Sequence, residues 1–119
     1  MMANKESVVT GEVVFAKGAK PFSGAVVTVR LSDVSMADGP AQPIAEQVIR
    51  GVSFDEKTRI PFRLRGRADN DRARYTVSAH VSLNGSSDIQ QGDYISMQSY
   101  PVLTFGALDR VTVEVRRVG

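Results

Sequence analysis

Polar and apolar residues alternate along most of this chain of 119 residues. In residues 75–83, YTVSAHVSL, every second side chain is apolar and the side chains between them are polar or small. Residues 25–32, AVVTVRLS, and residues 110–117, RVTVEVRR, follow the same pattern. Because successive side chains of a β-strand point to opposite faces, this period of two predicts half-buried antiparallel strands.

Weaker runs of the same kind complete the predicted set of strands, at residues 7–15, 44–49, 59–65 and 93–100. Pro61 cannot donate a ladder hydrogen bond, so we expect its strand at the edge of a sheet. Gly11 indicates a bulge or a close backbone approach within the first strand. The pair Asn84-Gly85 predicts a hairpin that joins residues 74–83 to a strand in residues 88–100.

These runs predict an all-β protein. About seven short strands separated by turn residues favour a single antiparallel β-sandwich, immunoglobulin-like or transthyretin-like in arrangement. A small closed barrel is the second architecture that the pattern allows. We expect residues 1–6 to be a flexible N-terminus and residues 7–118 to form the sandwich domain.

Composition narrows the chemistry that this domain can perform. The chain has 15 lysines and arginines against 13 aspartates and glutamates, and it has no cysteine. Disulfides, thiolate nucleophiles and cysteine-ligated zinc are therefore excluded. The main group of arginines, in residues 59–74, is interrupted by aspartates, so we expect no nucleic-acid partner. No run approaches the roughly 18 apolar residues of a membrane-spanning helix, so we expect no membrane span.

The stretch that most resembles a site is residues 31–47, LSDVSMADGPAQPIAEQ. Asp33, Asp38 and Glu46 could converge as the carboxylates of a hydrolase. The EF-hand calcium pattern, tested from Asp33, fails at its glycine and at its final glutamate. Aspartate beside serine, glycine and proline is typical of turns, because its carboxylate caps free backbone N–H groups. We therefore interpret Asp33 and Asp38 as capping the loop that follows the strand at residues 25–32.

His80 is the only histidine, and alternation places it on the polar face of its strand. No Gly-x-Ser-x-Gly nucleophile motif accompanies it. A metal site built on histidines would also lack a second imidazole. We predict no catalytic residue, no cofactor and no metal. An enzyme built on Asp33, Asp38 and Glu46, with His80, is kept as the less favoured alternative.

Residues 99–106, SYPVLTFG, form a dense apolar run before the last strand. The run could seal one end of the fold. It could also form an apolar groove that, beside an open sheet edge, receives a strand or helix of a partner.

The order of four motifs along the chain is similar to a known family. They are Leu31-Ser-Asp-Val-Ser-x-Ala-Asp38, Ile44-Ala-Glu-Gln47, Ile60-Pro-Phe62 and Tyr100-Pro-Val-Leu-Thr104. Over residues 7–118 the chain resembles the YbaY/YscW-like lipoprotein family, which includes the type III secretion lipoprotein chaperones, or pilotins. The resemblance implies a β-sandwich, usually exported and lipid-anchored in bacteria, with no catalytic motif. Pilotin members bind a secretin subunit and help it to reach and assemble in the outer membrane.

The resemblance favours a non-enzymatic binding or chaperone-like module, present as a monomer or weak dimer. Its partner would be a protein segment such as a secretin tail, held at a sheet edge. The side chains that we expect at the contact come from two predicted strands and the apolar run: Phe62, Tyr94, Met97, Tyr100, Val102 and Phe105. The location is cytoplasmic if this N-terminus is native, and the periplasm or outer membrane if a lipoprotein signal was removed.

Residues 18–29, GAKPFSGAVVTV, suggest an alternative function, that of a transthyretin-like carrier or adhesion module. An enclosed pocket inside the fold would favour a carrier, and a fully packed interior would count against one.

Overall fold

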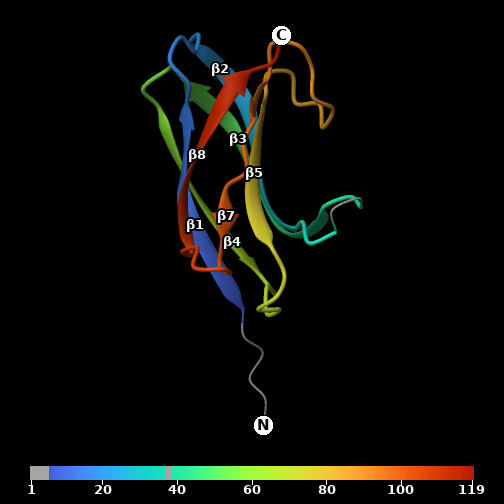
Figure 1. Cartoon of the computed structure of the whole chain (residues 1–119). Helices are drawn as coiled ribbons and strands as arrows, with labels where there is room; N and C mark the ends of the chain where they lie inside the picture. Colours follow the sequence, from blue (N-terminus) through green and yellow to red (C-terminus); the bar gives the residue numbers. More distant parts are fainter. Residues whose placement is uncertain (1–5, 37–38) are drawn as a thin grey trace.

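The computed structural model describes residues 6–36 and 39–119, and within these ranges the chain forms strands and no helix (Figure 1). The protein is therefore all-β, as the alternation predicted. The strands are β1 (Ser7–Phe15), β2 (Phe22–Asp33), β3 (Gln42–Phe54), β4 (Arg59–Gly66), β5 (Tyr75–Ser82), β6 (Tyr94–Ser96), β7 (Pro101–Val102) and β8 (Arg110–Arg117).

All these strands belong to one hydrogen-bonded sheet. Its order is β3-β2-β5-β6-β8-β1-β4, and the short β7 pairs with β5 beside this path. β1 and β8 are parallel, whereas the other pairs are antiparallel. The predicted β-sandwich is wrong, because the sheet coils into a nearly closed barrel and does not divide into two layers. The second architecture, a small closed barrel, lies closer to this structure.

The barrel almost closes where its two outer strands, β3 and β4, face each other. Side chains bridge this seam: the backbone N–H of Arg63 donates to Oε1 of Gln47 at 2.8 Å. Further along, a Cβ added at Gly66 would lie only 2.7 Å from Cγ2 of Ile44. As Pro61 indicated, β4 is the last strand of the order, and it remains outside a backbone ladder with β3.

Bulges in the longest strand pair help to bend the sheet. The register of β2 against β3 shifts between Phe22 and Ala25, between Ala25 and Val27, and between Leu31 and Ser32. Gly24 in β2 has a φ of 87°, a left-handed conformation that glycine adopts without strain. Because each bulge adds local twist, β2 and β3 curve enough to bring β3 round toward β4.

The alternating pattern of the long strands places one set of side chains inside the barrel, and these side chains fill its interior. Val9 and Val13 of β1, Val29 and Leu31 of β2, and Val113 of β8 are among its fully buried members. A filled interior of this kind counts against the carrier alternative.

Gly11 makes the close approach that its position in β1 predicted. A Cβ at Gly11 would lie 2.8 Å from Cζ of Phe62 and would clash with the carbonyl oxygen of Val111. The Phe62 ring therefore occupies space that a side chain at position 11 would need.

β5 and β6 are joined through Asn84-Gly85, as predicted, although the connection is longer than a two-residue turn. Gly85 has a φ of 80°, whereas Asn84 does not adopt a positive φ. Asn84 acts through its side chain, because its Oδ1 accepts a hydrogen bond from the backbone N–H of Ser86 at 3.0 Å.

Candidate functional site

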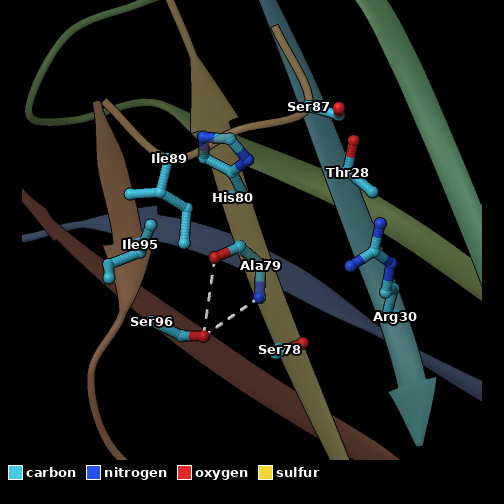
Figure 2. Close-up of a pocket in the computed structure, with 9 residues that line it drawn as sticks. All are labelled: Thr28, Arg30, Ser78, Ala79, His80, Ser87, Ile89, Ile95 and Ser96. Atoms are coloured by element: carbon cyan, nitrogen blue, oxygen red, sulfur yellow. Dashed lines mark hydrogen bonds between the residues drawn. The ribbon is translucent and has the colours of Figure 1, made fainter. Parts of the chain in front are cut away.

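A polar pocket lies on the outer face of the barrel beside His80. Cross-strand pairing places Thr28 of β2 and Ile95 of β6 on either side of His80 in β5. Figure 2 shows this arrangement, with Ser87 and Ile89 of the β5–β6 connection above the strands. The pocket has a volume of about 190 Å³, and we call it the His80 pocket; it is lined by Thr28, Arg30, Ser78, Ala79, His80, Ser87, Ile89, Ile95 and Ser96.

Asp93, which motif reasoning did not select, is the buried partner of His80. Its side chain is only 3% exposed, and its Oδ2 lies 2.8 Å from Nε2 of His80. The backbone N–H groups of Leu83 and Gln90 also donate to the carboxylate, at 3.1 and 3.0 Å. Burial alone would raise the pKa of Asp93, but these three hydrogen bonds outweigh burial and hold the pKa below its ordinary value.

The contacts of Asp93 fold the β5–β6 connection onto β5, which is a structural role. In the sequence, Gln91-Gly92-Asp93 has the composition of an ordinary turn, so its only available signal was an acidic residue at the start of a strand. Nothing in that signal distinguishes a buried carboxylate from an exposed one.

Two further polar groups of the His80 pocket, on Arg30 and Ser96, also have partners. Nε of Arg30 donates to Oε2 of Glu46 at 2.6 Å. The hydroxyl of Ser96 accepts from the backbone N–H of Ala79 at 3.0 Å, as the dashed line in Figure 2 shows. Among the described contacts, His80 is not hydrogen-bonded to a serine hydroxyl, so no nucleophile is paired with a base here.

The predicted carboxylate group is not assembled by the described residues. Asp33 caps its own turn, as expected, because its Oδ1 accepts from the backbone N–H and the hydroxyl of Ser35. These hydrogen bonds lower the pKa of Asp33. Glu46 is held by Arg30, and Asp38 lies outside the described residues.

Position along the strands separates these groups further. Asp33 is five residues along β2 from Thr28, the residue opposite His80, and five residues of strand span about 16 Å. In residues 6–36 and 39–119, no group of three or more acidic or histidine side chains could hold a metal ion.

The side chains expected to contact a partner separate into a buried set and an exposed set. The buried set belongs to the core or its ends: Phe62, Tyr94, Tyr100 and Val102. The exposed set is Met97 and Phe105, which are 53% and 64% exposed.

Two buried aromatic residues of that group have structural contacts. Tyr94 packs edge-on against Phe15 and Phe54, and its hydroxyl accepts from the backbone N–H of Lys20 at 3.1 Å. The hydroxyl of Tyr100 accepts from the backbone N–H of Glu114 at 2.9 Å. Of the six side chains expected at a partner contact, only Met97 and Phe105 are therefore exposed.

A second, more apolar hollow lies beside Phe105. We call it the Phe105 groove; it has a volume of about 230 Å³ and is lined by Val34, Arg74, Tyr75, Thr76, Ser99, Pro101, Thr104, Phe105 and Ala107. Cζ of Arg74 lies 4.6 Å from the centre of the Phe105 ring, within the range of a cation–π contact. The groove therefore combines an exposed aromatic ring with one cationic group.

The loop that carries Phe105 is strained and yet firmly held. Leu103 and Phe105 have φ values of 72° and 54°, and they are the only non-glycine residues with positive φ in the described ranges. The N–H of Leu103 donates to the carbonyl of Leu108 at 2.9 Å, and the hydroxyl of Thr104 donates to the carbonyl of Ala73 at 2.7 Å. Backbone strain that the surroundings enforce is concentrated at functional sites, so this loop is the stronger candidate for binding.

The described residues thus form a packed barrel with two surface hollows. The chain belongs to the family described as type III secretion system lipoprotein chaperone (YscW), whose family model matches residues 4–115. An alternative pilotin from the type II secretion system of Vibrio cholerae has a similar solved structure, with a TM-score of 0.77 and 31% sequence identity. The alignment covers 97% of this chain and 99% of that one. A comparison with curated proteins found no match.

The family match confirms the resemblance that the four sequence motifs indicated. A chaperone family is non-enzymatic in kind. A lipoprotein family indicates association with the bacterial envelope, and it gives no support to the cytoplasmic expectation. Within the part of the chain that the structure describes, no helix is long and apolar enough to cross a membrane.

Proposed function

We propose that this protein is a non-enzymatic, pilotin-like chaperone that binds a segment of a secretin subunit at the bacterial envelope. The observation that carries the proposal is the match to the lipoprotein chaperone family over residues 4–115. The pilotin similarity supports it, because 31% identity extends over nearly the whole of both chains.

The Phe105 groove is the surface that we assign to the partner. The segment between β6 and β8, which supplies part of the groove lining, also carries three large exposed hydrophobic side chains: Met97, Phe105 and Leu108. An exposed aromatic residue in a shallow apolar hollow is a usual anchor point for a peptide. The loop hydrogen bonds keep the ring in place before binding, which lowers the ordering cost of the complex.

The sheet edge is less suited to receive the segment. An added strand would have to pair with the free side of β3 or β4, and these strands face each other across the seam. The contact of Gln47 with the N–H of Arg63 already occupies one of the groups that an incoming strand would use. The groove needs no such rearrangement, so we place the partner there.

The chemistry of the groove indicates which segment would fit. Phe105, Pro101 and Val34 offer apolar contact, while Arg74 offers a positive charge beside the ring. A segment with an apolar residue next to an acidic one would complement both features.

Titration of the isotope-labelled protein with peptides from secretin C-terminal tails tests the proposal by NMR. We expect amide shifts in residues 74–76 and 99–108, and none in the β5–β6 connection. A scrambled peptide of the same composition is the control. Absence of shifts for all tail peptides, or shifts confined to the His80 pocket, would show that the proposed site is wrong.

A further inference from the structure

A second surface, formed by the outer faces of β4, β1 and β8, carries an unbalanced positive charge. These strands lie side by side (Figure 1). Thr10 of β1 is paired with Arg63 of β4 on one side and with Arg110 of β8 on the other, and Val8 is paired with Arg65. The three exposed arginines therefore surround two short side chains; we call Arg63, Arg65 and Arg110 the arginine face.

On the outer face of the three strands, the arginines at the other end are ion-paired and those at this end are not. Toward the other end, Arg59 pairs with Glu12 at 3.2 Å and Arg116 pairs with Glu114 at 2.8 Å. No ion pair within the described ranges includes a member of the arginine face. Two exposed carboxylates neighbour the face in the sequence, Glu6 just before β1 and Asp109 just before β8, and neither forms a described ion pair. The described contact of Asp109 is made by its backbone carbonyl, which accepts from the N–H of Thr10.

The shape of the arginine face suits a flat ligand. Neither the His80 pocket nor the Phe105 groove includes any of its residues. Recognition of an acidic peptide generally adds a side-chain pocket to the charge, and an extended sheet surface without a pocket offers only charge. An anionic bilayer surface needs no pocket, because its attraction for exposed arginines is electrostatic and adds with their number.

The position of the face at the end where β1 begins gives a second reason. Ser7 is paired with Gly66, so the chain that leads into the barrel enters beside Arg65. A covalently attached lipid would hold the domain close to a bilayer, and the family that the chain matches is described as a lipoprotein chaperone family. A cationic face at this end would determine which side of the barrel turns toward the lipid.

We propose that the arginine face docks against anionic phospholipid headgroups at a bilayer surface. This inference goes beyond peptide binding, because it uses a different surface and a different ligand. It requires no insertion of the barrel into the bilayer.

Co-sedimentation with vesicles tests the proposal. The unmodified chain should bind vesicles that contain phosphatidylglycerol and phosphatidylcholine at low salt, should be released at high salt, and should ignore pure phosphatidylcholine. The variant R63Q/R65Q/R110Q should lose binding by on the order of 100-fold. The control R30Q/R59Q/R116Q removes the same number of positive charges from arginines that are ion-paired, and it should keep most of the binding.

Three results would overturn the proposal. They are failure of the unmodified chain to bind phosphatidylglycerol vesicles, equal loss of binding in both variants, and binding of a poly-glutamate peptide at the arginine face in place of vesicles. Because all the substituted side chains are exposed, both variants should unfold at the unmodified midpoint, which a thermal scan checks. The secretin-tail titration is read at the Phe105 groove, so either proposal can fail without the other.

Discussion

The His80 pocket and the Phe105 groove are both surface hollows of similar size, but their residues are used in opposite ways. In the His80 pocket, the charged groups are matched inside the protein: His80 with Asp93, and Arg30 with Glu46. In the Phe105 groove, a large ring stands exposed on a loop with left-handed backbone. The first region looks more like a catalytic site in sequence, because it holds the only histidine.

The difference shows that polar residues in a hollow are a poor guide to function when their hydrogen bonds are already satisfied within the fold. Satisfied groups stabilise the structure that contains them. An exposed apolar ring in a strained conformation gains nothing comparable from the folded chain alone. Substitutions in the His80 pocket should therefore change stability, whereas substitutions in the Phe105 groove should change binding.

The largest effect is expected for Asp93→Ala in the His80 pocket. The substitution leaves the N–H groups of Leu83 and Gln90 and the ring of His80 without their acceptor. Removing one partner from a buried charged network should lower the free energy of unfolding by about 3 kcal/mol. Denaturant titration measures this loss, and secretin-tail binding by the folded fraction should be unchanged.

Asp88→Ala is the matched control for Asp93→Ala, because Asp88 is an exposed carboxylate in the same connection. It should change stability by less than about 0.5 kcal/mol. If both substitutions cost the same, the hydrogen bonds of Asp93 do not hold the connection in place.

The second effect is on binding, and Phe105→Ala should produce it. Loss of the ring should weaken binding of a secretin-tail peptide by about 30-fold, or about 2 kcal/mol, because buried aromatic anchors contribute on this scale. Fluorescence anisotropy with a labelled peptide measures the change in Kd. Ile89→Ala removes an exposed apolar side chain from the His80 pocket and should leave Kd unaltered. Equal weakening by both would contradict the assignment of the groove.

The third effect is the pH dependence that Asp93 contributes to stability. Hydrogen bonds hold its folded-state pKa below the value of about 3.9 that an unfolded chain would show. The unfolded state therefore takes up the proton first as the pH falls. The stabilisation should be complete above about pH 4 and should disappear as the pH falls through the folded-state pKa.

Comparison of unfolding curves for the unmodified chain and Asp93→Asn measures that acid-dependent part. Asparagine keeps one acceptor oxygen and does not titrate, so the difference between the two proteins should shrink as the medium is acidified. A constant difference from neutral pH to acid would show that folding does not shift the pKa of Asp93.

The smallest effect concerns backbone strain at the Phe105 groove. Phe105→Gly and Phe105→Ala both remove the ring, but only glycine adopts a φ of 54° without strain. The glycine variant should therefore be more stable than the alanine variant by about 1 kcal/mol, while both bind the peptide weakly. Equal thermal midpoints would indicate that the loop relaxes once the ring is gone.

Several features of the fold could be predicted from the sequence because they depend on local chemistry. Alternation identified the strands, Pro61 placed β4 at an outer position, and Gly11 indicated a close approach. The candidate site was harder to predict. Apolar residues such as Tyr100 and Phe105 are close together in sequence, but their opposite exposure depends on how the loop meets the barrel.

The sequence by itself determined an all-β chain, its inward-facing residues and its family, because the period of two and short motifs are properties of neighbouring residues. Only the tertiary structure decided between a sandwich and a nearly closed barrel, since both bury the same alternating side chains. Bulges in β2, the parallel pairing of β1 with β8 and the seam between β3 and β4 made that choice. The tertiary structure also decided that Asp93 is buried beside His80 and that Phe105 is exposed, because both depend on contacts between residues that are not neighbours in the chain.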